Sequence, residues 1–135
     1  MSELSLEATV ESLPRVLDFV TGILEPYGCS MRTQMQIEVA VEELYVNIAH
    51  YAYQPGTGPA LIRAEVREDP PTAVITFIDH GVPYDPLAKE DPDVTLAAED
   101  RTIGGLGIYM VKKSMDKMYY EHTGGQNILT IEKVL

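Results

Sequence analysis

Three polar side chains recur at helical spacing within the segment 30–50. Glu43, Asn47 and His50 are separated by four and three residues, so at about 100° per residue they fall on one stripe of a helix. An amide oxygen and a carboxylate one turn apart suit a hard cation beside a proton acceptor, because Mg²⁺ prefers oxygen ligands and keeps several waters. The same spacing is also typical of a solvated polar face, and spacing alone does not choose between the two readings.

A second candidate group directly follows the apolar run 73–78. Asp79 would emerge at the end of a strand, where its carboxylate can accept a hydrogen bond from the exocyclic amine of a base. Gly81, two residues later, would allow a ligand to approach the backbone. An Asp-x-Gly sequence after a strand is also ordinary turn chemistry.

The third candidate is the turn Gly104-Gly105-Leu106-Gly107, which precedes an apolar pattern at helical spacing. Backbone amides at a helix N-terminus form a site for phosphate oxygens. The turn lacks the spacing of a P-loop and of the dinucleotide fingerprint, so it is weak evidence by itself. All three groups in this order, with a long irregular segment between the second and the third, are more specific than any one of them.

The hydrophobic pattern predicts the elements that position these groups. Alternation predicts strands and spacings of three and four predict helices, in the order strand 4–10, helix from 12, helix 30–50, strands 61–67 and 73–78, an irregular stretch 81–103, a short helix, and strands 117–122 and 127–134. We therefore expect one α/β (α+β) domain over residues 1–135, a two-layer sandwich with helices on one face of a mixed, mostly antiparallel sheet. A long loop in a small domain is typical of a lid, here about 84–103.

Composition excludes several classes of function. Ten basic and twenty-one acidic residues give a formal net charge of −11, which argues against binding to nucleic acid and to anionic lipid. No apolar run approaches the roughly 20 residues that cross a bilayer, and the N-terminus does not resemble a secretory signal. We therefore expect a cytoplasmic protein. Cys29 is the only cysteine, so neither an internal disulfide nor a cysteine metal cluster is expected.

Together the motifs resemble the ATP-binding superfamily of gyrase-type ATPases, histidine kinases and MutL (GHKL), and within it the bacterial anti-sigma factor serine kinases. Residues 41–47 are similar to the family's Glu-x-x-x-Asn helix, 79–86 to its Asp-x-Gly-x-Pro-aromatic-Asp-Pro box, and 104–108 to its later glycine box. The chain departs at His80, where the family usually has Asn, and at Tyr51, where it has His. The resemblance covers nearly the whole chain and implies a Bergerat-type ATP-binding fold.

The resemblance also implies a role for each site residue. Asn47 would coordinate Mg²⁺, Asp79 would recognise the adenine amino group of ATP, and Gly81 would shape the floor under the base. Glu43 would be the catalytic general base, accepting the proton of a protein serine hydroxyl. Thr130, on the last strand, would either support Asp79 from behind or pack within the sheet; alternation along the strand allows both readings.

By the same resemblance the turn Gly104-Gly105-Leu106-Gly107 would bind the nucleotide, with Gly105 and Gly107 beside the triphosphate. The implied partners are a protein antagonist that carries the acceptor serine, a sigma factor that is sequestered, and a second copy of the chain in a homodimer.

Three functions compete. The leading hypothesis is a protein serine/threonine kinase that also sequesters a partner. The alternative is an ATP-gated protein-interaction module without phosphoryl transfer, and a third reading is a plain α/β domain whose motifs are coincidental. Glu43 favours the kinase, because a pure nucleotide binder does not need a base.

Overall fold

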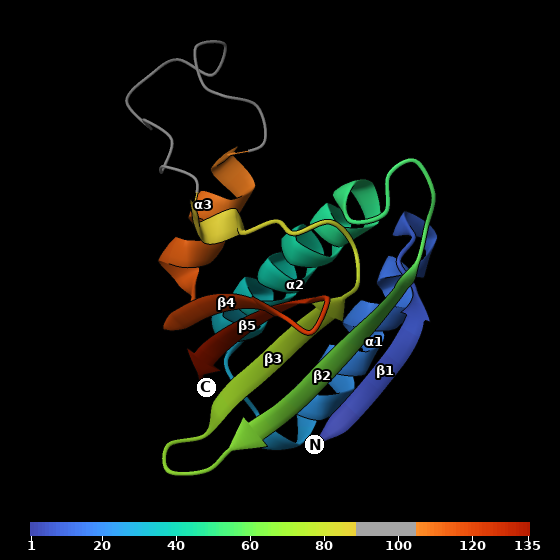
Figure 1. The fold of residues 1–135 in the computed structure, drawn as a ribbon. Coiled ribbons are helices and arrows are strands. Elements are labelled where there is room, and N and C mark those ends of the chain that lie inside the picture. The colour runs from blue at the N-terminus through green and yellow to red at the C-terminus, as the bar shows by residue number, and fades with distance from the viewer. Residues whose placement is uncertain (89–104) are drawn as a thin grey trace.

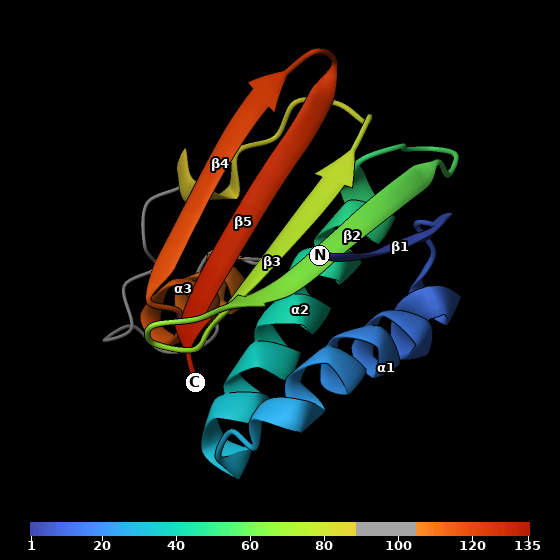
Figure 2. The same ribbon diagram turned by 90° about the horizontal axis from the view of Figure 1, so that it is seen from below.

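A single antiparallel sheet, with helices on one face, forms the body of the protein (Figures 1 and 2). The structure is a computed structural model that describes residues 1–88 and 105–135, without the side chains of Gly105 and Leu106. The elements in chain order are β1 Ser2–Glu7, α1 Leu13–Leu24, α2 Met31–Tyr51, β2 Pro59–Arg67, β3 Thr72–Asp79, α3 Gly105–Ser114, β4 Lys117–Thr123 and β5 Gln126–Val134, with short 3₁₀ turns at Val10–Ser12, Glu25–Tyr27 and Pro86–Ala88.

The strands lie in the order β1-β2-β3-β5-β4. Each neighbouring pair in this order is antiparallel, so the parallel pairing that a mixed sheet would contain is absent from the described strands. The predicted two-layer α+β class is confirmed. Since β5 lies between β3 and β4, the last strand of the chain pairs directly with the strand that ends in Asp79.

The first strand is shorter than its alternation predicts. β1 ends at Glu7, and the expected continuation to Val10 is wrong. The Ala8 N–H donates to the carbonyl of Gly58 at 2.9 Å, and a 3₁₀ turn then begins at Val10, whose side chain is exposed. The chain therefore leaves the sheet early and turns into α1.

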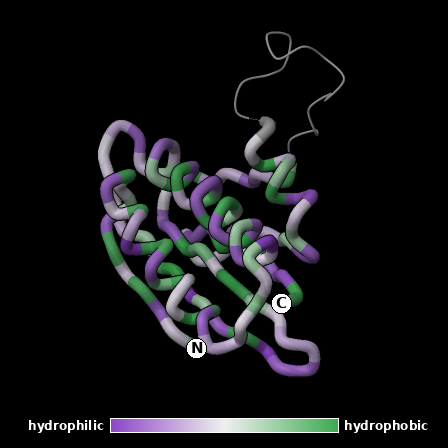
Figure 3. Tube along the Cα trace, turned by 180° about the vertical axis from the view of Figure 1, so that it is seen from behind, coloured by the Kyte–Doolittle hydropathy of each residue, from purple (hydrophilic) through white to green (hydrophobic). Residues whose placement is uncertain are grey.

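Each long helix buries one stripe against the sheet. Green and purple stretches alternate along the helices in Figure 3, as expected for elements with one buried and one exposed face. Ser30 caps the start of α2, because its hydroxyl accepts the N–H of Thr33 at 3.1 Å. No helix within the described ranges has both the length and the apolar run to cross a membrane. The buried core includes Val16, Val20, Leu24, Ile37, Val41, Leu44, Ile62, Ile75, Phe77 and Ile131.

One buried hydroxyl fastens α2 to the end of β1. Tyr45 is fully buried, and its hydroxyl donates to the carbonyls of Thr9 at 2.7 Å and Glu7 at 3.2 Å. Burial raises the pKa of the Tyr45 phenol above its ordinary value of 10.0, because the ionised form loses more hydration than the neutral form. The neutral phenol is therefore the form that the fold stabilises.

We expect Tyr45→Phe to lower the free energy of unfolding by about 1–2 kcal/mol, because it removes the part-buried hydrogen bonds of this hydroxyl to the carbonyls of Glu7 and Thr9. The raised pKa has a further consequence. The stability that the protonated Tyr45 phenol adds to the folded state is fully present below pH 10, and it is lost as the pH rises through the pKa of the folded state. Urea unfolding at neutral pH and between about pH 9 and 11 checks both effects, with the exposed Tyr27→Phe as control. Unchanged stability in Tyr45→Phe would contradict the role of the hydroxyl.

Candidate functional site

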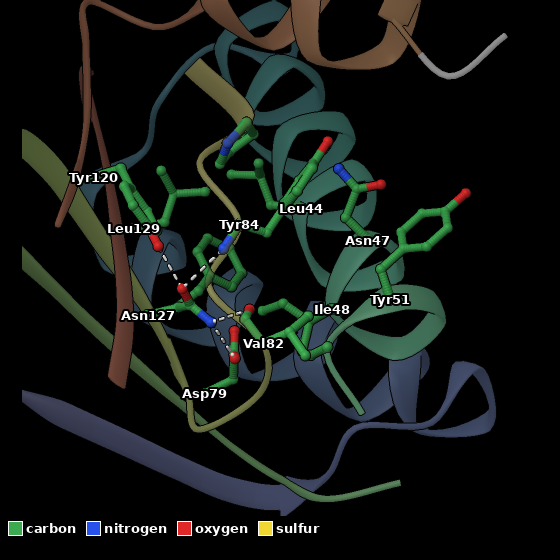
Figure 4. Close-up of a pocket in the computed structure, with 13 residues that line it drawn as sticks. Leu44, Asn47, Ile48, Tyr51, Asp79, Val82, Tyr84, Tyr120, Asn127 and Leu129 are labelled. Carbon is green, nitrogen blue, oxygen red and sulfur yellow. Dashed lines mark hydrogen bonds between the residues drawn. The ribbon is translucent and has the colours of Figure 1, made fainter. Parts of the chain in front are cut away.

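A pocket of about 460 Å³, including its open mouth, lies between α2, the ends of β3 and β5, and the segment that follows β3 (Figure 4). Its walls are mostly apolar and carry a few polar groups, which is the usual composition of a small-molecule site. The lining residues are Leu44, Asn47, Ile48, Tyr51, Ala52, Phe77, Asp79, Val82, Tyr84, Pro86, Tyr120, Asn127 and Leu129.

The Asp79 carboxylate lies at one end of this pocket and is only 5% exposed. Its Oδ1 accepts two hydrogen bonds of 2.9 Å, from the Gly81 N–H and from Asn127 Nδ2. Within the described residues, Oδ2 accepts no hydrogen bond. The described residues have no buried side-chain oxygen without a partner, so Oδ2 is accessible, and it is an acceptor that a ligand N–H can fill.

Asn127 is the residue that holds this arrangement together (Figure 4). Besides Asp79, its Nδ2 donates to the Val82 carbonyl at 2.9 Å. Its Oδ1 accepts the Tyr84 N–H at 3.3 Å and the Tyr120 hydroxyl. The side chain is 6% exposed, and it links β5, β3, β4 and the segment 82–84.

Sequence reasoning missed Asn127 and selected Thr130 instead. Thr130 lies three residues further along β5, and an odd separation on a strand places it on the opposite face of the sheet. There its hydroxyl lies 3.2 Å from the hydroxyl of Thr76. The structure therefore does not bring Thr130 to Asp79, and the packing role is the reading that fits. The signal available in the sequence was a polar residue at the start of the last predicted strand, and the register that sets it opposite Asp79 comes from the structure.

The second helix brings its polar stripe to two different places. Asn47 lines the pocket, whereas Glu43, one turn earlier, lies against α3. A Cβ added to Gly107 would overlap Glu43 Oε2 and would lie 2.9 Å from Glu43 Cδ. His50 is exposed and does not line the pocket. The structure thus brings Glu43 to the glycine motif, and Asn47 to the pocket that Asp79 also lines.

The predicted short helix is present as α3, but it begins at Gly105, within the glycine motif and not after it. Leu106 and Gly107 belong to its first turn. Gly104 lies outside the described residues, as does most of the expected lid about 84–103. The phosphate-binding role of the turn therefore stays a prediction.

Gly81 is packed against the end of α2. A Cβ at this position would overlap the Ala52 carbonyl oxygen and lie 2.6 Å from Ala52 Cβ. The next residue, Val82, donates its N–H to the same carbonyl at 2.9 Å. The close approach explains why glycine is needed here, and it ties the pocket wall to α2.

The described residues contain no group of three or more His, Cys, Asp or Glu side chains that could hold a metal ion. The side chain of Asn47 instead offers a single amide oxygen on the pocket wall. This donor set fits Mg²⁺ that arrives with a nucleotide, because Mg²⁺ keeps several waters and takes the rest of its ligands from phosphates.

Comparison with known proteins places the chain in a family. A family model described as the histidine kinase-like ATPase domain matches residues 6–133. The chain belongs to this family. It is 28% identical over 128 residues to the serine/threonine-protein kinase BtrW of Bordetella bronchiseptica, covering 95% of this chain and 89% of that protein. It is 27% identical over 137 residues to the serine-protein kinase RsbW of Halalkalibacterium halodurans, covering 98% and 82%.

Solved structures support the same fold. The structure of the RsbU and RsbW domains of a Mycobacterium tuberculosis protein matches with a TM-score of 0.67 and 16% identity. The match covers 100% of this chain and 33% of that one. The SiaB–SiaC complex from Pseudomonas aeruginosa matches with a TM-score of 0.60 and 16% identity, covering 98% and 89%. At these identities the likeness shows the fold, which is the fold that the resemblance implied.

We expect Gly81→Ala to destabilise the protein by about 1–3 kcal/mol, because the added methyl group would displace backbone atoms at the end of α2. The matched control is Gly22→Ala on the exposed side of α1, where a Cβ meets nothing within 4 Å. That control should be neutral or stabilising, since alanine is the better helix former. Urea unfolding of the two variants checks the difference, and equal stability would contradict the packing of Gly81.

Proposed function

We propose that this chain binds Mg·ATP and transfers the γ-phosphoryl group to a serine hydroxyl of a protein antagonist. One observation carries the proposal. A buried carboxylate, with one oxygen held by two donors, lies in an apolar pocket whose wall includes Asn47, one helical turn from Glu43. Relatives named as serine or serine/threonine-protein kinases, at 27% and 28% identity, support kinase activity at the level of the family.

The pocket suits the base of the nucleotide. Asp79 Oδ2 would accept the exocyclic amine of adenine, and the ring would lie between apolar side chains such as Ile48 and Leu129. An amine that donates to a carboxylate forms a charge-assisted hydrogen bond, which is stronger than a neutral one. The tight packing of Gly81 on Ala52 would hold the chain under the base in place.

The stretch of α2 from Asn47 back to Glu43 suits the phosphates. Asn47 would hold Mg²⁺, which neutralises the charge that develops on the phosphate oxygens. The N-terminal turn of α3, with Gly105 and Gly107, would lie beside the triphosphate and offer backbone N–H groups. Gly104 and Leu106 complete the proposed turn.

Glu43 would be the general base. Its carboxylate would take the proton of the acceptor serine as the serine oxygen forms a bond to the γ-phosphorus. The bond from the γ-phosphorus to the bridging oxygen breaks, and ADP leaves with that electron pair. Phosphoryl transfer depends mainly on positioning and charge stabilisation, so the contact of Glu43 with α3 at Gly107 would hold the base in place.

The proposal extends to partners and location. We infer a protein antagonist with an acceptor serine, sequestration of a sigma factor, a homodimer and a cytoplasmic location. The neighbouring SiaB structure was solved as a complex with SiaC, which is consistent with a protein partner for this fold. Glu43 lies outside the pocket lining, and this favours the alternative of an ATP-gated interaction module enough to require a direct test.

We expect Asp79→Asn to weaken ATP binding by roughly 10- to 150-fold, the effect of about 1.5–3 kcal/mol for a hydrogen bond to a charged group. An amide that kept its oxygen toward Gly81 and Asn127 would point its NH₂ group at the adenine amine. Titration with a fluorescent ATP analogue and Mg²⁺ measures the change, with the exposed Asp18→Asn as control. Unchanged affinity in Asp79→Asn would show that the pocket is not the nucleotide site.

We expect Glu43→Gln to reduce phosphoryl transfer at least roughly 100-fold, the usual contribution of a general base. Glutamine has the same shape, so the contact with Gly107 and the affinity for ATP should survive. The measurement is transfer of label from γ-labelled ATP to candidate antagonist proteins encoded nearby, with the adjacent, exposed Glu42→Gln as control. If the wild-type chain binds ATP but labels no acceptor, the interaction module is the better reading.

A further inference from the structure

We propose that Asn127, held in one orientation by the hydroxyl of Tyr120 and the backbone of Tyr84, is the positioning residue that makes the pocket select an amino-purine over an oxo-purine nucleotide. This inference rests on the proposed nucleotide site and assigns its base specificity. It concerns a residue that does not itself need to touch the ligand.

The orientation of the Asn127 amide follows from its neighbours. An asparagine offers a donor end and an acceptor end, and rotation by a half-turn exchanges them. Two donors, the Tyr84 N–H and the Tyr120 hydroxyl, converge on one end. Two acceptors, Asp79 Oδ1 and the Val82 carbonyl, each lie 2.9 Å from the other end. A flipped amide would set donors against donors and acceptors against acceptors, so only one orientation satisfies all four.

In this orientation every hydrogen-bonding position of the Asn127 amide is occupied. Both N–H groups and both acceptor positions of Asn127 are used inside the protein, so the side chain cannot turn to donate to a ligand. Asp79 Oδ1 is likewise occupied, by Asn127 and by the Gly81 N–H. Asp79 Oδ2, an acceptor, is the side-chain atom of Asp79 and Asn127 that no hydrogen bond between described residues occupies.

Asp79 Oδ2 discriminates between bases because it can only accept a hydrogen bond and because the Asn127 amide beside it cannot turn to donate one. The 6-amino group of adenine donates to Oδ2, whereas the 6-oxo group of hypoxanthine or guanine brings a second acceptor to the same place. A site built to bond one polar group rejects the analogue that leaves its own groups unpaired. Without the Asn127 donor to Oδ1, the Asp79 carboxylate would no longer be held in one orientation with Oδ2 toward the base, and the discrimination would fall.

Tyr120 is well placed to hold the Asn127 amide in this one orientation. It lies on β4, the neighbour of β5, and its side chain lines the pocket next to Asn127 (Figure 4). The Tyr120 phenol keeps its proton at neutral pH because its ordinary pKa is 10.0, and burial raises that pKa further. Asn127 also bonds the backbone of Val82 and Tyr84 in the pocket wall. The same side chain therefore orients Asp79 and holds the wall of the pocket.

The test compares the affinities of the full-length chain for ATP and inosine triphosphate, both with Mg²⁺, by displacement of a fluorescent nucleotide. We expect the wild type to prefer ATP by about tenfold or more. Tyr120→Phe should reduce that preference roughly threefold or more, and Asn127→Leu should bring it close to one. Asn127→Thr keeps one donor and one acceptor and should retain part of the preference.

Thr76→Val, on the opposite face of β3, is the control and should keep the wild-type ratio. Each variant is first checked for cooperative thermal unfolding. If Asn127→Leu does not fold, Tyr120→Phe and Asn127→Thr decide the result. A purely structural role would weaken both nucleotides equally and leave the ratio unchanged, which would overturn the inference.

The outcomes separate this inference from the proposed function. A wild-type chain that binds neither nucleotide removes the proposed function, and this inference with it. A wild-type chain that binds both equally well overturns the inference alone. A clear preference for ATP that persists in folded Asn127→Leu and Tyr120→Phe also overturns the inference alone.

Discussion

The hydrogen bond between the buried side chains of Asp79 and Asn127 is the constraint on which the site depends. It forms because β5 pairs with β3 in a register that places the two residues directly opposite each other. A carboxylate at 5% exposure would be costly without donors, and the Asn127 amide and the Gly81 N–H supply them. The same amide holds the segment 82–84, so one side chain fixes both the acceptor and the wall of the pocket.

Two close contacts connect this site to the helices. Gly81 packs on the last turn of α2 at Ala52, and Gly107 packs on Glu43 in the middle of the same helix. Helix α2 therefore carries Asn47 to the pocket and Glu43 to α3 on one rigid element. The three candidate groups of the sequence, which lie far apart in the chain, meet along this helix.

Most of the fold was predictable, because hydrophobic periodicity reports which face of an element is buried. The stripe through Ile37, Val41 and Leu44 predicted α2, and alternation predicted β2 and β3. The end of β1 was not predictable, since the turn after Glu7 depends on a hydrogen bond to Gly58, some fifty residues away. Asp79, Asn47 and Glu43 were found because their types and spacing belong to a recurring pattern.

The sequence by itself determined which side chains have the chemistry for this site and in what order they occur. Only the tertiary structure decided which residue supports Asp79. Asn127 and Thr130 are both polar residues on the last strand, and they differ in the face of the sheet on which they lie. That face depends on the β3–β5 register and on the insertion of β5 between β3 and β4. Pairing between distant strands, unlike periodicity within one strand, is set by packing across the whole sheet.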